Sequence, residues 1–180
     1  MQRLSQSISA SRLGAILAGG LIAGTLDIGS ASLINFVSPV LILRYIASGV
    51  LGVRAFDTGA AAAWLGLLLQ WLMSLLIAAI YWLVTSRWRS LRARWRLGGL
   101  CAGVVTFLVM NFLVMPLSAA PVTYRDIAEH FDPLKSAANL LAMLVFGWIV
   151  AYCARRLGGE TRAAAAGHAG MRQVQGESRL

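Results

Sequence analysis

Asp27 is the residue with the clearest chemical potential, because its carboxyl group lies within a long apolar stretch of the sequence. An ionisable group near the centre of a bilayer costs about 2.5–3.5 kcal/mol or more, so such a group marks an ion or proton pathway, or a strong structural contact. Helical spacing places Asp27 on one small and polar face with Gly20, Ala23, Gly24 and Ser30. That face must turn toward other helices and away from lipid.

Two further apolar stretches carry polar residues that could meet Asp27. At a rise of about 1.5 Å per residue, Asp27 and Asn111 each lie about 14 residues, or about 21 Å, from the start of their stretches. Gln70 lies about 11 residues from the start of a stretch that runs the other way. The predicted intramembrane polar cluster comprises Asp27, Ser30, Gln70, Ser74, Thr106 and Asn111. Two interpretations stay open: a hydrogen-bonded structural cluster, or one polar pocket open to the outside.

Several other chemistries have no anchor in the sequence. The chain contains no GxSxG, HExxH, P-loop or CxxC motif. A haem-binding bundle needs histidines on facing helices, but His130 and His168 both lie outside the apolar stretches. Cys101 and Cys153 lie inside apolar runs, so a secreted disulfide framework is not expected. We therefore predict no enzymatic activity, no catalytic residue, no cofactor and no metal.

The elements that must position these residues are transmembrane helices. With 58% hydrophobic and 13% charged residues, the 180-residue chain is too apolar for a water-soluble domain. Four stretches reach the roughly 20 residues that a membrane crossing needs, namely Leu13–Asn35, Gly59–Thr85, Leu97–Leu117 and Leu134–Leu157. The predicted fold is an all-α membrane protein, a bundle of four transmembrane helices.

A fifth apolar segment follows the first stretch. Residues 39–53 number only about 15, short for a crossing, so we expect an interfacial or re-entrant helix there.

Residues that favour helix ends lie beside the stretches. Asp57 or Thr58 could cap the second helix, and Asp132 with Pro133 is a good start for the fourth. Gly158 and Gly159 are expected to end the fourth helix.

The distribution of arginine predicts the topology. The formal charge of +9 would suggest a nucleic-acid partner, but the arginines sit in clusters that flank apolar runs, which is typical of membrane proteins. With four crossings, the basic N-terminus, central loop and C-terminal tail share one side, and the positive-inside rule makes that side cytoplasmic. The predicted parts are a cytoplasmic N-terminus (1–12), a transmembrane domain (13–157) and a flexible basic tail (158–180). The basic loop comprises Arg87, Arg89, Arg92, Arg94 and Arg96.

Two sequence patterns predict contacts with lipid or with other helices. Trp88, Leu91 and Trp95 share one stripe of an expected interfacial helix, whose arginines would face anionic lipid or serve only as a topology signal. The GxxxG patterns Gly20–Gly24 and Gly99–Gly103 allow close helix approach, either within the bundle or in a homo-oligomer.

Three segments carry a resemblance to a known family: residues 20–27 (GLIAGTLD), residues 46–49 (IASG), and residues 110–118, which include Asn111 and Pro116. They resemble a group of small uncharacterised bacterial inner-membrane proteins, with YagU-like proteins the nearest named relatives. The resemblance covers most of residues 14–155 and implies a four-helix inner-membrane protein, without implying an activity. We expect a non-enzymatic accessory or structural role; the alternative is a small homo-oligomeric permease or channel, with Asp27 as its proton- or solute-linked group.

Overall fold

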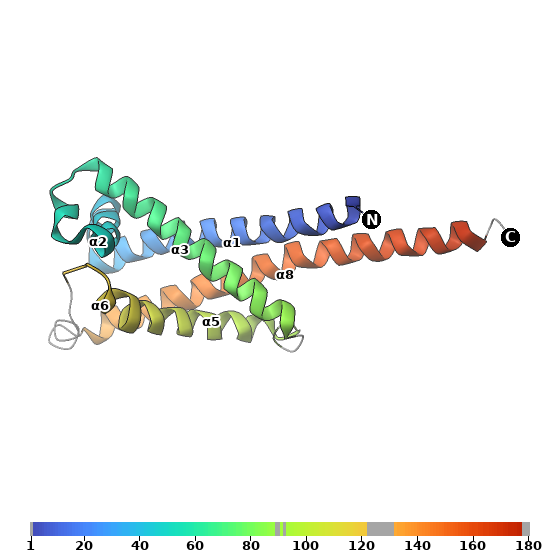
Figure 1. Cartoon of the computed structure of the whole chain (residues 1–180). Helices are drawn as coiled ribbons and strands as arrows, with labels where there is room; N and C mark the ends of the chain where they lie inside the picture. The colour runs from blue at the N-terminus through green and yellow to red at the C-terminus, as the bar shows by residue number, and fades with distance from the viewer. Residues whose placement is uncertain (1, 89–90, 92, 122–131, 178–180) are drawn as a thin grey trace.

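The computed structural model describes residues 2–88, 91, 93–121 and 132–177, with the backbone alone for 2–12 and 157–177. All regular structure in this part of the chain is helical (Figure 1). The elements are α1 (Gln2–Asn35), α2 (Pro39–Leu51), the 3₁₀ helix η1 (Gly52–Phe56), α3 (Ala60–Arg87), α5 (Trp95–Val109), the π-helical turn η2 (Met110–Val114), α6 (Met115–Leu117) and α8 (Pro133–Glu177).

The helices pack as a layered bundle around α1 and α8. The most extensive contacts are between α1 and α8, followed by those between α5 and α8. Helix α3 crosses α1, and the short α2 packs mainly against α3. Both chain ends and the α3–α5 connection lie toward one end of the bundle, while α1 ends and α3 begins at the other (Figure 1). We call the end of the bundle with both chain ends the basic end, because it carries Arg87, Arg94, Arg96, Arg155 and Arg156.

Within the described residues, five helical segments are long and apolar enough to cross a membrane, judged by length and composition. They are Leu13–Asn35, Pro39–Phe56, Ala60–Arg87, Trp95–Leu117 and Pro133–Arg156. Four of them coincide, within two residues at each end, with the stretches expected from the sequence. The fifth arises because η1 continues α2 and lengthens this segment to 18 residues. The chain is thus an α-helical, multi-pass membrane protein by these criteria.

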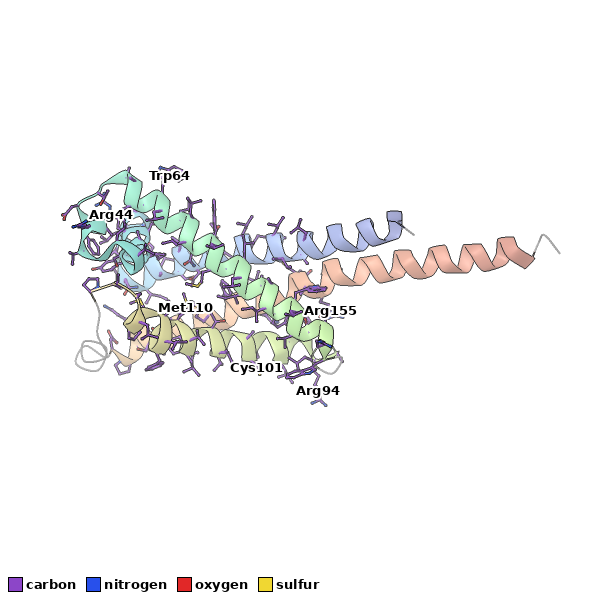
Figure 2. All side chains as sticks on the ribbon, in the orientation of Figure 1. Arg44, Trp64, Arg94, Cys101, Met110 and Arg155 are labelled. Carbon is purple, nitrogen blue, oxygen red and sulfur yellow. The ribbon has the colours of Figure 1, made fainter. Side chains whose placement is uncertain are left out.

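The distribution of side chains on α3 is the reverse of that on a helix of a water-soluble protein. Its buried stripe is made of small and polar residues that recur at helical spacing, including Gly66, Gln70, Ser74 and Ala78. Its exposed stripe is made of large apolar residues, Trp64, Leu68, Leu72, Leu76, Ile80 and Leu83. Trp64 projects away from the neighbouring helices (Figure 2). A surface of this composition needs lipid around it, because water would penalise such a continuous apolar stripe.

The expected helix starts are confirmed in one case and wrong in another. The Oδ1 atom of Asp132 accepts hydrogen bonds from the backbone N–H groups of Leu134 and Lys135, so Asp132 caps α8 and Pro133 begins it. Neither Asp57 nor Thr58 caps α3, which starts after Gly59 without a side-chain cap. The Thr58 hydroxyl instead donates to the Arg54 carbonyl of η1, and Gly59 turns the chain with a φ of 65°.

The prediction that Gly158 and Gly159 end the last helix is wrong. Helix α8 continues through both glycines to Glu177, with a total length of 45 residues. A glycine inside a helix costs about 1 kcal/mol relative to alanine and does not by itself forbid helix. Four consecutive alanines, Ala163–Ala166, follow and favour continuation of the helix. The basic tail therefore has helical backbone over most of its length.

Candidate intramembrane polar site

A hydrogen bond between α1 and α3 forms the centre of the polar site. The Nε2 atom of Gln70 donates to Oδ2 of Asp27 over 2.8 Å. Gln70 is 6% exposed, and Asp27 is partly buried. The sequence placed both residues on inward faces at similar depth, and the structure brings them into direct contact. Because the amide and carboxyl groups satisfy each other, two polar groups are accommodated inside an apolar bundle.

Close approach of the two helices makes this contact possible. A Cβ added at Gly20 would lie 2.9 Å from the Leu75 Cα, and one added at Gly24 would collide with the Ser74 hydroxyl. Glycine at these two positions leaves room for the α3 backbone beside Gly20 and for the Ser74 side chain beside Gly24. Ser74 is itself satisfied, since its Oγ donates to the Gln70 carbonyl over 2.8 Å.

A second hydrogen bond between the same helices was not predicted from the sequence. The indole Nε1 of Trp71 donates to the Thr25 hydroxyl over 3.2 Å. Trp71 follows Gln70 directly, and Thr25 lies two residues before Asp27. The sequence signal that could have indicated this bond was the polar hydroxyl of Thr25, two residues before Asp27. The two bonds together hold α1 and α3 in one register.

Two of the three remaining members of the predicted cluster form hydrogen bonds within their own helices. Ser30 Oγ donates to the Leu26 carbonyl of its own helix over 2.9 Å. Asn111 Nδ2 donates to the Phe107 carbonyl over 2.8 Å, also within its own helical segment. Thr106 is buried on α5, three residues after Gly103, on the face that packs against α8. The structure thus unites Asp27, Gln70 and Ser74, and places Thr106 and Asn111 on a helix whose main partner is α8.

Asn111 lies in the π-helical turn η2. Pro116 cannot donate a backbone hydrogen bond, and its ring conflicts with the carbonyl four residues earlier. The π turn relieves this conflict, and Met115 N–H bonds to the Met110 carbonyl five residues back. Such turns concentrate at functional sites. Beyond the turn, the Ala119 N–H donates to the Gly49 carbonyl of α2 over 2.9 Å.

Both GxxxG patterns pack inside the chain. Gly20 and Gly24 lie against α3, as described above. Gly99 and Gly103 lie against α8, where a Cβ on Gly103 would be 2.8 Å from the Leu144 Cα. A homo-oligomer would therefore need a different surface.

The basic loop is described in part. Arg87, Arg94 and Arg96 are exposed at the basic end, whereas Arg89 and Arg92 lie outside the described residues. Trp88 follows the last residue of α3 and Trp95 is the first residue of α5. Trp88 has an extended backbone, whereas Leu91 and Ala93 of the expected interfacial helix are helical; residues 89, 90 and 92 lie outside the described residues.

Comparison with known proteins adds no family to these observations. No protein-family model, curated protein or solved structure matches the chain. The resemblance to YagU-like proteins stays a prediction. Among the described residues, no three His, Cys, Asp or Glu side chains are grouped to hold a metal ion.

Proposed function

We propose that this chain is a non-enzymatic accessory protein of the bacterial inner membrane. The observation that carries the proposal is the Asp27–Gln70 hydrogen bond. Because the carboxyl group of Asp27 accepts from the buried amide of Gln70, it joins α1 to α3 as a structural contact. The packing of Gly24 against Ser74 leaves little room for a solute beside that pair. The polar groups of α5 do not converge on it either, as a shared transport pocket would require.

The arrangement of helices supports four crossings with both ends in the cytoplasm. Helix α1 ends and α3 begins at the same end of the bundle (Figure 1). A full crossing by Pro39–Phe56 would place these two points on opposite sides of the membrane. The segment then lies at the outer face as an interfacial or re-entrant helix, and the basic end faces the cytoplasm by the positive-inside rule.

The lengths of α1 and α8 indicate where an accessory protein would make contacts. Their 34 and 45 residues correspond to about 51 and 68 Å at 1.5 Å per residue, against a hydrocarbon core of about 30 Å. Both helices extend beyond the other helices at the basic end (Figure 1). This projecting pair and the basic loop offer contact sites for lipid or a protein partner.

Reconstitution tests the accessory role against the permease alternative. Proteoliposomes containing the parent protein should show no proton flux above that of empty vesicles under an imposed membrane potential. The Asp27→Asn variant should give the same trace. A protein-dependent flux that Asp27→Asn abolishes would overturn the proposal in favour of a permease with Asp27 as its titrating group.

Cysteine labelling tests the topology. Single cysteines at positions Ser5, Ser90 and Ser178 should resist an impermeant thiol reagent applied to intact cells, whereas one at Ser118 or Thr123 should react. The background is a variant in which Cys101 and Cys153 are replaced by serine. Strong external labelling at position 90 would show that Pro39–Phe56 crosses the membrane.

A further inference from the structure

We propose that α5 and α8 form a binding site for one anionic phospholipid at the basic end, with its phosphate held between Arg96 and Arg155. The inference depends on membrane embedding and is independent of whether the protein transports a solute. It adds a defined site to the diffuse attraction that any basic loop has for anionic lipid.

An aromatic cluster fixes the geometry of the site. Trp95, the first residue of α5, stacks on Trp148 of α8 with ring centroids 5.9 Å apart and an angle of 20° between the rings. Tyr152, one turn further along α8, lies 6.0 Å from the same Trp95 ring. Tryptophan and tyrosine prefer the level of the lipid headgroups, so this cluster marks the membrane surface on the two helices.

Two guanidinium groups, one from each helix, lie against this cluster. The Cζ atom of Arg155 is 5.0 Å from the centroid of the Trp95 ring, and that of Arg96 is 5.5 Å from it. These two distances place the guanidinium carbons no more than 10.5 Å apart, so both groups lie beside the same ring. Cation–π contact holds the planar groups in place while their N–H edges stay available.

The guanidinium groups of Arg96 and Arg155 have no anionic partner among the described side chains. Among the side chains that the structure describes, which on α8 end at Arg156, neither Arg96 nor Arg155 has an ion pair, and both are exposed. A guanidinium carries five N–H donors in a fork that matches phosphate oxygens. The third arginine, Arg156, donates through Nε to the Tyr152 hydroxyl over 3.1 Å and adds positive charge beside the pair. Charge complementarity therefore calls for an anion with several oxygen acceptors.

An exposed apolar stripe on α8 distinguishes a lipid from a soluble anion. It leads from the arginines toward the far end of the helix through Tyr152 (43% exposed), Trp148 (45%), Val145 (47%) and Leu141 (64%). The spacing of these four residues keeps them on one face of the helix. An acyl chain can lie along this stripe while the phosphate stays between the arginines. A free phosphate or an acidic peptide could occupy the arginines but would make no use of the stripe that leads away from them.

Native mass spectrometry of the full-length protein in mixed micelles of phosphatidylglycerol and phosphatidylcholine tests the site. The parent should retain phosphatidylglycerol preferentially. In the variant R96Q/R155Q that preference should fall roughly thirtyfold, given about 1 kcal/mol for each of the two arginines. The control R87Q/R94Q removes the same charge from exposed arginines at the same end and should keep the preference.

Further arms separate the site from its alternatives. R96K/R155K keeps the charge but loses the planar fork, so its preference should fall between those of the parent and R96Q/R155Q. An equal loss in R96Q/R155Q and R87Q/R94Q would overturn the site in favour of diffuse attraction. Displacement of the retained lipid by millimolar inorganic phosphate would overturn phospholipid as the ligand. The R96Q/R155Q comparison requires that this variant keep the thermal midpoint of the parent. If R96Q/R155Q is destabilised, the lipid preference of R96K/R155K decides between the site and diffuse attraction.

Discussion

Gly147→Ala is expected to push α8 away from α5 and to lower the free energy of unfolding by about 1–3 kcal/mol or more. A Cβ at Gly147 would collide with the Gly99 carbonyl oxygen and would lie 2.9 Å from the Gly103 Cα. Because the opposing atoms are backbone, no side-chain rotation can relieve the overlap. The thermal midpoint of the purified protein in detergent is the measurement, and Gly103→Ala should give a similar loss.

The chain supplies a matched control for this prediction. Gly29 also lies inside a long apolar helix, but a Cβ there would meet no atom within 4 Å. Gly29→Ala should therefore leave stability unchanged or raise it by about 0.5–1 kcal/mol, the helix preference of alanine over glycine. If Gly29→Ala were as damaging as Gly147→Ala, glycine content and not close packing would be the cause. The double variant G103A/G147A should cost less than the sum of the single losses, since both changes separate the same two helices.

Asp27→Leu is expected to lower the free energy of unfolding by about 1–3 kcal/mol, because it leaves the buried Gln70 amide without its acceptor. Asp27→Asn should cost much less, since the asparagine carbonyl can still accept from Gln70 Nε2. The double variant D27L/Q70L should recover much of the loss, because replacing both partners with apolar groups leaves no unsatisfied donor. Thermal midpoints of all variants provide the comparison.

Ser30→Ala is the matched control for the Asp27 series. Its hydroxyl bonds only to the Leu26 carbonyl of the same helix, so its removal should change stability by less than about 0.5 kcal/mol. A D27L/Q70L variant less stable than D27L alone would contradict a purely pairwise structural contact. It would indicate that Gln70 has a further role besides holding Asp27.

Much of the fold follows from the length and the inner faces of the apolar stretches. Leu13–Asn35 is a helix with the expected membrane-spanning bounds, and Asp132 caps α8 as predicted. Gln70 and Ser74, which the sequence places in the polar cluster, are both buried on α3. These features depend on local chemistry, because a polar or small face must avoid lipid whichever helix it meets.

The same reasoning could not predict which helices pack against each other. Depth placed Asn111 level with Asp27, yet α5 packs on α8 and leaves Asn111 bonded to its own helix. Depth is a one-dimensional measure, and it carries no information on the order of helices around a bundle. The end of α8 was missed for a different reason, because glycine allows a helix to stop without requiring it.

The pairing of the first and last long helices has a consequence for assembly during synthesis. Helix α8 begins roughly 100 residues after α1 ends, so at 5–20 residues per second α1 waits about 5–20 s for its largest partner. Its Gly19 face meets Cys153 in the finished protein and lacks that partner during this interval. Gln70 follows Asp27 by only 43 residues and emerges from the ribosome much sooner. The nascent α1 can therefore shield its carboxyl group with α3 long before the bundle is complete.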